Sequence, residues 1–421
     1  QPPRNRAFSG VPTVIKDNIP VAGMPTGFGS QALRGQIAAR HGSYTRQYQS
    51  LGMTILGKSS LPEFGFNATT EPMHRAATPN PWHPEHSAGA SSGGSAALVA
   101  AGVVPIAHGN DGGGSIRIPA ACCGLVGLKP SRDRHVNTAM ARSLPVNIVS
   151  EGVLTRSVRD TATFHFEMQT AYRHRQLPLL PHVQGPGKTR LRIGLFDESV
   201  TGAPTDKATR QIVHAVADTL SSLGHTVVPI RNPVDAGFAE DFARYWGMMA
   251  FMVKHGGRLS LPGAFTPRAL DPLSHGLARY YLRHALATPL IIKRLRQHGH
   301  AFAEQFERVD VMLSPVLSQA PAPLGHLHPE QDFEVLFNKL RSYVGFTPIA
   351  NVAGTPAMSL PGGLNAQGLP IGVQLFADWG HEKALLELAF ELEAARPFPR
   401  IQQSHTSKVV TRAQAGEALT L

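Results

Sequence analysis

The sequence DGGGSIRIPA, at residues 111–120, is the most informative segment of this chain. A second small-residue stretch, GASSGGS, occupies residues 89–95, and a single lysine, Lys16, precedes both within the sequence VIKDN. Ser115 follows Ser91 by 24 residues, and Lys16 precedes Ser91 by 75 residues. A lone glycine–serine run is common in turns. Two such runs that follow a lysine segment, in this order and at this spacing, form a specific signature.

These pieces resemble the signature of the amidase signature family, whose members cleave amide bonds with a Ser-Ser-Lys triad. The resemblance covers nearly the whole chain, because GTPA at residues 354–357 and LPIGVQ at 369–374 also look like this family's sequences. It implies an α/β fold with a mixed, twisted central β-sheet flanked by α-helices on both faces. Members usually carry a helical segment before the lysine strand, and none precedes it here, so we expect the natural N-terminus to lie upstream of Gln1.

The resemblance also implies a role for each motif residue. Ser115 corresponds to the nucleophile, and Lys16 corresponds to the base. Ser91 corresponds to the serine that bridges them, next to a cis Ala90–Ser91 peptide bond. A lysine accepts a proton only when it is neutral, so burial must lower the pKa of Lys16. The two residues before it are apolar and suit that burial.

Glycines precede the candidate nucleophile, and without a Cβ their N–H groups can converge on one point. N–H groups arranged in this way stabilise the negative charge that develops on a carbonyl oxygen. The resemblance implies an oxyanion hole formed by Gly112, Gly113, Gly114 and Ser115. It also implies that Asp111 and Arg117 are framework residues, which hold the loop by ion pairs and hydrogen bonds.

Candidate substrate contacts have a weaker signal in the sequence. We select Phe66, Asn67 and Trp246 as substrate-binding residues. Trp246 lies in a cluster rich in methionine and aromatic residues, which fits a hydrophobic core as well as a pocket. We interpret residues 233–310 as a helical substrate-channel and cover segment. This segment predicts a preference for hydrophobic acyl or amine groups.

Loop sequences narrow the resemblance. TTEP at 69–72, TPNPW at 78–82 and HGND at 108–111 look most like the branch that holds 6-aminohexanoate cyclic-dimer (nylon-oligomer) hydrolase. Asn110 stands where many family members have threonine, and Ala90 stands where glycine or serine is usual. The resemblance implies a serine hydrolase that cleaves C–N bonds of linear or aryl amides through an acyl-enzyme. Carbamates, urethanes and esters are open to the same chemistry.

Other functions stay open on the sequence alone. The glutaminase-type A subunit of a tRNA-dependent amidotransferase shares the signature, although EGVLTR at residues 151–156 resembles free-standing amidases more closely. A non-catalytic binding protein that keeps the fold is disfavoured by the intact Lys16, Ser91 and Ser115. GASSGGS could form a phosphate loop, but it lacks the lysine that such a loop requires.

Composition excludes several classes of protein. The 421 residues are 42% hydrophobic and 16% charged, which suits a large folded core and not a disordered chain. The net charge is +11, but Lys and Arg are scattered without a long basic run, so we expect no nucleic-acid partner. No apolar stretch is long enough to cross a bilayer, and Pro289 interrupts the basic amphipathic segment, so membrane contact is not expected.

Cysteine and histidine usage gives no sign of a cofactor. Cys122 and Cys123 are adjacent, so we expect two small buried hydrophobic residues in a reduced, cytoplasmic setting, not a disulfide. The 20 histidines show no metal-binding spacing, so we predict neither a metal site nor a cofactor. The expected partner is a small-molecule amide substrate, bound by a monomer or homodimer.

We interpret residues 1–421 as a single amidase signature domain, with its catalytic motifs confined to residues 1–160. A Pro/Gly-rich connection at 177–188 is the best candidate for an internal boundary. Strands are expected at 11–16, 53–57, 103–108, 191–196, 309–313, 357–360 and 371–376, and helices at 92–101, 209–223 and 381–395.

Overall fold

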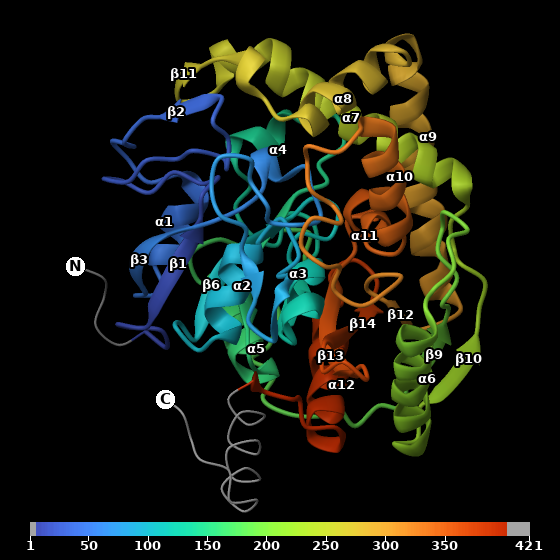
Figure 1. The fold of residues 1–421 in the computed structure, drawn as a ribbon. Helices are drawn as coiled ribbons and strands as arrows, with labels where there is room; N and C mark the ends of the chain where they lie inside the picture. The colour runs from blue at the N-terminus through green and yellow to red at the C-terminus, as the bar shows by residue number, and fades with distance from the viewer. Residues whose placement is uncertain (1–5, 402–421) are drawn as a thin grey trace, which may run out of the picture.

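A mixed eight-stranded β-sheet forms the centre of the protein in the computed structural model, which describes residues 6–401 (Figure 1). The strand order is β10-β9-β12-β14-β13-β7-β8-β6. The first three strands in this order are parallel to one another, and each later neighbouring pair is antiparallel. The strands are β6 (Ile106–Asp111), β7 (Val126–Lys129), β8 (Ser150–Thr155), β9 (Arg192–Leu195), β10 (Thr226–Pro229), β12 (Val311–Pro315), β13 (Ala357–Leu364) and β14 (Pro370–Phe376).

Helices cover both faces of this sheet, which confirms the predicted α/β fold. Strands β6, β8 and β14 are buried along their whole length, as is typical of a sheet between two layers. One face carries α5 (Val158–Met168), α6 (Lys207–Ser222) and α12 (Glu382–Ala395). The other face carries α2 (Gly93–Ala100) and α3 (Arg117–Cys123).

Glycines in the sheet allow α3 to lie directly on the strands. A Cβ at Gly127 would lie 2.7 Å from the Ala120 Cβ, and a Cβ at Gly372 would lie 2.5 Å from the Ala121 Cβ. Real side chains do not approach so closely, so the two glycines in β7 and β14 set the height of the helix above the sheet. The glycine loop that ends at Ser115 therefore sits at the end of the sheet.

A separate parallel pair, β1 (Pro12–Lys16) and β3 (Thr54–Ser59), lies beside β6 on the left of Figure 1, next to α1 (Ser43–Gln49). Thr13 Oγ1 donates to the Ile106 carbonyl at 3.0 Å, and the N–H of the last β1 residue donates to His108 Nδ1 at 3.2 Å. These contacts hold the end of β1 against the end of β6.

The helix α2 begins where the backbone passes unusually close to its neighbours. A Cβ at Gly94 would lie 2.4 Å from Ser60 Oγ, and a Cβ at Gly93 would lie 2.3 Å from Thr70 Oγ1. Only glycine fits at both positions, which explains the GG pair after the two serines. The close packing places Ser91, which precedes the helix, at the surface of β6 and β1.

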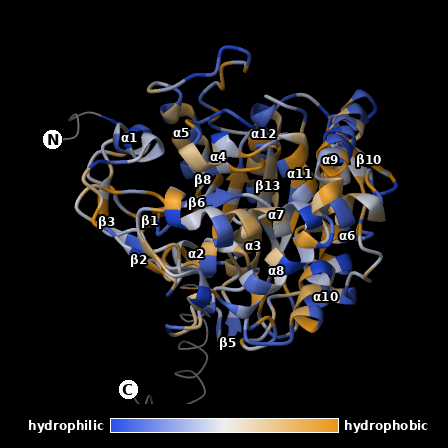
Figure 2. Ribbon diagram, turned by 90° about the horizontal axis from the view of Figure 1, so that it is seen from above, coloured by the Kyte–Doolittle hydropathy of each residue, from blue (hydrophilic) through white to orange (hydrophobic). Residues whose placement is uncertain are grey.

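A layer of helices extends from the top of the molecule down its right-hand half in Figure 1. The layer contains α7 (Ala236–Ser260) and α8 (Pro272–Leu282) at the top, followed by α9 (Thr288–Ala303), α10 (Phe333–Tyr343) and α11 (Pro348–Ala353). The short pairing of β11 (Gly263–Phe265) with β2 (Leu33–Gly35) ties this layer to the N-terminal part of the chain. Seen from above, the outer helices α6, α9 and α10 alternate hydrophobic and hydrophilic turns (Figure 2).

Most expected elements appear with shifted ends. The strand expected at 103–108 is β6 and begins three residues later, at Ile106, because a turn covers the intervening residues. The strand β8 had no counterpart in the expected set. The remaining short elements are β4 (Pro79–Asn80), β5 (His83–Ser87), α4 (Ala139–Ser143) and the 3₁₀ turns Glu63–Gly65, Pro267–Ala269, Ala285–Ala287 and Glu304–Glu307. Within residues 6–401, no helix combines the length and the apolarity that a membrane span needs.

Candidate active site

Lys16 is fully buried, and its side-chain nitrogen makes two short hydrogen bonds. Lys16 Nζ lies 2.7 Å from Ser91 Oγ and 2.6 Å from Asn110 Oδ1. Asn110 Oδ1 also accepts a hydrogen bond from Asn18 Nδ2 at 3.3 Å. The lysine of β1, the serine before α2 and the amide of β6 therefore meet at one point, although 75 and 94 residues separate them from Lys16 along the chain.

Burial lowers the pKa of Lys16 from its ordinary 10.5 to about 7, although the carboxylates of Glu151 and Asp111 act in the opposite direction. Val14 and Ile15, on the same strand, are also buried. At neutral pH much of the Lys16 population is therefore uncharged, and an uncharged amine can accept a proton.

A second buried lysine, Lys129, differs in its surroundings. Burial, and then Arg117, lower the pKa of Lys129 to about 7. Its Nζ donates to the Pro130 carbonyl at 2.7 Å, and it does not line the cavity described below. The geometry therefore separates Lys16 from this structural lysine.

The glycine loop connects β6 to α3 and ends at Ser115, which is partly exposed. The Ala90–Ser91 peptide bond nearby is cis, as expected. The Gly114 N–H donates to Asp111 Oδ1 at 2.7 Å, so this donor is not available to a ligand. Within residues 6–401, the N–H groups of Gly112, Gly113 and Ser115 have no partner. Of the four predicted oxyanion donors, Gly114 is thus occupied, and the N–H groups of Gly112, Gly113 and Ser115 are free in the described part of the chain.

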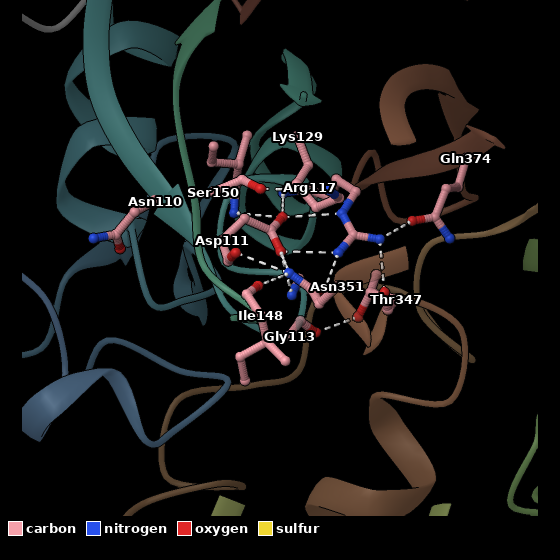
Figure 3. Close-up of polar contacts among 12 residues, drawn as sticks. Asn110, Asp111, Gly113, Arg117, Lys129, Ile148, Ser150, Thr347, Asn351 and Gln374 are labelled. Atoms are coloured by element: carbon pink, nitrogen blue, oxygen red, sulfur yellow. Dashed lines mark hydrogen bonds and ion pairs between the residues drawn. The ribbon is translucent and has the colours of Figure 1, made fainter. Parts of the chain in front are cut away.

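Asp111 and Arg117 form a fully buried ion pair beside the loop (Figure 3). Arg117 Nε and a terminal guanidinium nitrogen approach the two carboxylate oxygens of Asp111 at 2.9 and 2.8 Å. Burial alone would raise the pKa of Asp111, but the charge and hydrogen bonds of Arg117 hold this pKa well below its ordinary value. The same carboxylate also accepts the Ile116 N–H at 3.1 Å, so the predicted framework contacts are present.

Three residues far along the chain complete this framework, and the sequence motifs did not identify them. Arg117 donates to the Thr347 carbonyl at 2.8 Å, to Asn351 Oδ1 at 2.6 Å and to Gln374 Oε1 at 2.6 Å. Figure 3 shows these groups converging on the guanidinium, whereas Asn110 points away from it. Gln374 lies in the quoted LPIGVQ segment, but Thr347 and Asn351 belong to no motif that we distinguished.

Ser91, Asn110 and Ser115 line one cavity of about 950 Å³. One face of α7 supplies a wall of this cavity, at the spacing of successive helical turns. The lining is mostly apolar and includes Phe28, Phe64, Phe66, Phe238, Phe242, Trp246, Met249, Phe251, Met252, Val253 and Leu340. The polar side chains include Asn18, Asn67, Glu151, His255 and Arg341.

The three predicted substrate residues all line the cavity, in different ways. Phe66 is a buried part of the apolar wall. The Asn67 side chain donates to the Leu327 carbonyl at 2.9 Å and accepts the Ala68 N–H at 2.7 Å, so its amide mainly holds the backbone. The Trp246 ring stacks on Phe337 with centroids 6.0 Å apart, and it therefore serves both the core and the cavity wall.

The two cysteines play no part in this cavity. Cys122 and Cys123 are free and buried, as predicted. Burial raises the pKa of Cys122 to about 12, which makes the thiol unreactive. In the part of the chain that the structure describes, no three His, Cys, Asp or Glu side chains are grouped as metal ligands would be.

The amidase family model matches residues 3–386. The protein named "Putative amidase AmiC" of Mycobacterium tuberculosis is 47% identical over 395 residues, which cover 94% of this chain and 83% of that protein. Both findings extend over the motifs and the helical layer together.

Solved structures give the same result. The 6-aminohexanoate cyclic dimer hydrolase superposes with a TM-score of 0.83 and 29% identity, over 93% of this chain and 86% of that chain. A bacterial aryl acylamidase of the amidase signature family gives a TM-score of 0.78 and 26% identity, over 93% and 84% of the chains. A glutamyl-tRNA(Gln) amidotransferase subunit from Thermotoga maritima gives 0.76 and 26%, over 94% and 86%. This chain belongs to the amidase signature family and is an amidase, a hydrolase of carbon–nitrogen bonds.

Proposed function

We propose that this amidase cleaves linear or aryl amides with apolar groups through an acyl-enzyme on Ser115, with Ser91 and Lys16 as its proton relay. The observation that carries the proposal is the 2.7 Å contact between Lys16 Nζ and Ser91 Oγ at the edge of the cavity that Ser115 also lines. A buried amine with a pKa near 7 is suited to act as a base at neutral pH.

In the acylation step, neutral Lys16 takes the Ser91 proton while Ser91 takes the Ser115 proton. Ser115 Oγ then forms a bond to the amide carbonyl carbon, and the carbonyl electron pair moves to its oxygen. When this tetrahedral adduct collapses, the C–N bond breaks and the proton returns through Ser91 to the leaving nitrogen. The product of this step is an ester on Ser115 and a free amine.

In the deacylation step, water replaces the amine and attacks the ester carbonyl. The same relay takes the water proton and returns it to Ser115 as the acid leaves. The free N–H groups of Gly112, Gly113 and Ser115 are the candidate donors to the oxyanion in both steps. One such donor is typically worth about 3 kcal/mol of transition-state stabilisation.

The cavity lining supports amides with hydrophobic acyl or amine groups. Its volume of about 950 Å³ is suited to a substrate larger than a simple primary amide. Each methylene buried against this wall contributes about 0.8 kcal/mol to binding. Carbamates, urethanes and esters of similar shape are further candidate substrates, since they react through the same acyl-enzyme.

The glutaminase role in an amidotransferase is the alternative function, and the fold of that protein is shared with this chain. Free glutamine is a small polar molecule with two charges, and a cavity of this volume with a mostly apolar lining leaves much of its wall without a contact to such a substrate. The apolar wall therefore favours the free-standing amidase. Ammonia release from glutamine, increased by a partner protein, would support the alternative instead.

A fluorophosphonate probe tests the proposed nucleophile. The probe should add once, and peptide mapping should place it on Ser115, with loss of amide turnover. Ser115→Ala should abolish both labelling and turnover, while Ser222→Ala, at an exposed serine of α6, should retain both. Full turnover in a folded Ser115→Ala protein would disprove the mechanism.

A further inference from the structure

A buried histidine and a buried carboxylate lie next to Lys16. His108 is on β6 and Glu151 is on β8, and these strands are neighbours in the antiparallel ladder. His108 Nε2 lies 2.9 Å from Glu151 Oε2, and His108 Nδ1 accepts the Lys16 N–H at 3.2 Å. All three side chains are almost completely buried. The proposed mechanism uses neither His108 nor Glu151.

The two hydrogen bonds fix the protonation of His108. The Lys16 backbone N–H can only donate, so Nδ1 must be the acceptor and carry no proton. The single imidazole proton is therefore on Nε2 and is donated to Glu151. Burial lowers the pKa of His108, which is consistent with a neutral ring. A neutral His108 leaves the negative charge of Glu151 uncompensated by the ring.

The second carboxylate oxygen of Glu151 is also uncompensated in the part of the chain that the structure describes. Glu151 Oε1 is buried and has no hydrogen-bond partner within residues 6–401. A buried carboxylate with one unpartnered oxygen keeps a strong electrostatic effect, because no donor among the described residues compensates that oxygen. Its field acts on Lys16 and favours the ammonium form.

Few other charges compete with Glu151 around Lys16. Asp111, also on β6, favours the ammonium form of Lys16 less than Glu151 does, and Arg117 opposes its charge in a buried ion pair. On β3, Lys58 forms an ion pair with Asp17 at 3.1 Å. On α1, burial raises the pKa of Tyr44 well above 10, so this phenol is neutral. Ser91 and Asn110, which contact Lys16 directly, carry no charge.

We propose that Glu151 is a positioning residue for Lys16: it orients the His108 ring that holds the Lys16 backbone, and its buried charge sets the pH at which Lys16 becomes a base. This inference rests on the proposed function, because it assumes that Lys16 acts as the base. It deepens that function, since it explains how a fully buried lysine is kept near neutrality and not driven to a lower pKa. Glu151 thus controls the working pH range of the enzyme through Lys16.

Glu151→Gln removes the negative charge of the side chain and keeps its shape. The glutamine carbonyl oxygen can still accept the His108 proton, so the geometry is retained while the negative charge is lost. We expect the acidic limb of kcat/KM against pH to move about one pH unit lower, because the charge of Glu151 favours the ammonium form of Lys16 and a neighbouring opposite charge typically shifts a pKa by about that amount or more. Glu151→Asp keeps the charge but shortens the reach to His108, and it should lower kcat while leaving the limb in place.

Direct titration of Lys16 makes the result independent of catalysis. In protein labelled with ¹⁵N-lysine, the Nζ resonance absent from Lys16→Met identifies Lys16, and its midpoint should fall in Glu151→Gln as the activity limb does. Glu71→Gln is the matched control, because Glu71 is a buried carboxylate that does not line the cavity, and it should shift neither curve.

The possible outcomes distinguish the role of Glu151 from the proposed role of Lys16 as base. If the parent shows an acidic limb and Glu151→Gln moves neither the limb nor the Lys16 resonance, the inference about Glu151 is overturned. It is also overturned if Glu151→Asp moves both curves as far as Glu151→Gln, since packing and not charge would then be the cause. If the Lys16 resonance titrates as expected but the parent has no acidic limb, the proposed role of Lys16 as base fails instead.

Discussion

Thr347 Oγ1 donates a hydrogen bond of 2.6 Å to the Gly113 carbonyl, across 234 residues of sequence. The Thr347 carbonyl also accepts from Arg117, so one residue holds both the glycine loop and its buried ion pair. A Cβ at Gly114 would lie 2.4 Å from this hydroxyl, so the loop and the threonine fit each other closely. The orientation of the Gly113 peptide therefore depends on a residue outside every motif.

Thr347→Val should lower kcat by about tenfold to a hundredfold with little change in KM. The Gly113–Gly114 peptide that Thr347 holds lies between the candidate donors Gly113 N–H and Ser115 N–H, so a shift of the loop weakens both donors in the transition state. Valine matches the shape of threonine but cannot donate. Thr219→Val is the control, since that hydroxyl also donates to a carbonyl, at 2.9 Å within α6, and it should leave kcat unchanged. An unchanged kcat in Thr347→Val would show that the loop keeps its shape without this bond.

Lys16→Met should reduce turnover by at least about a thousandfold, since the relay loses its base. Lys383→Met, at an exposed lysine of α12, should retain turnover. Turnover in the parent should rise with pH through the pKa of Lys16 near 7. A flat profile across neutral pH would contradict this role.

The same variant tests the burial of Lys16 through stability. Lys16 titrates at 10.5 when exposed and at about 7 in the folded protein. Between these values the unfolded chain binds the extra proton, so the free energy of unfolding rises with pH. The parent should therefore gain stability relative to Lys16→Met between these two pKa values, by a few kcal/mol at most. The free energies of unfolding of both proteins can be measured by urea denaturation at each pH. If they change equally with pH in the parent and in Lys16→Met, Lys16 is not buried as described.

Substrate length tests the apolar cavity. In the parent, kcat/KM should rise about fourfold for each methylene added to an aliphatic amide, which corresponds to about 0.8 kcal/mol. Trp246→Ala should flatten the series, because the indole lines the cavity. Trp379→Ala, at a tryptophan outside the cavity lining, should keep the slope. A series without any slope in the parent would reject the hydrophobic substrate class.

Limited proteolysis tests the prediction of a single domain. The connection at 177–188 carries no helix or strand, so it is the expected site of cleavage. The chain before it supplies β6, β7 and β8, and the chain after it supplies the other strands of the same sheet. We expect the two fragments to stay associated on gel filtration and neither to fold when expressed alone. Two separately stable halves would divide the chain into two domains.

Those parts of the candidate site that lie within short segments could be predicted from the sequence. Lys16, Ser91 and Ser115 lie in glycine-rich or apolar segments with a fixed local geometry, and the pairing of Asp111 with Arg117 spans only six residues. The resemblance to the amidase signature family likewise predicted the mixed sheet. The missed strand β8 carries Glu151 and Gly152 at its start, which weakened its β pattern.

The remaining parts of the site depend on packing between distant segments. Thr347 and Asn351 are ordinary polar residues at the start of α11 and within it, and only the approach of that helix to α3 gives them a role. The sequence likewise did not show which N–H groups of the glycine loop are free to bind an oxyanion. Which donor Asp111 occupies depends on side-chain geometry that three consecutive glycines do not specify.

The strand order has a consequence for the chain as it leaves the ribosome. β13 and β14 follow all the other strands of the sheet in the sequence and lie between β12 and β7, so the sheet stays split in two until both have been made. Until then β7 and β12 present unpaired edges, which are sites of aggregation. Arg117 meanwhile lacks Gln374, which lies in β14. A nascent chain that ends before these strands therefore contains Lys16, Ser91 and Ser115 without the complete framework around the glycine loop, and its open strand edges are where chaperone binding is expected.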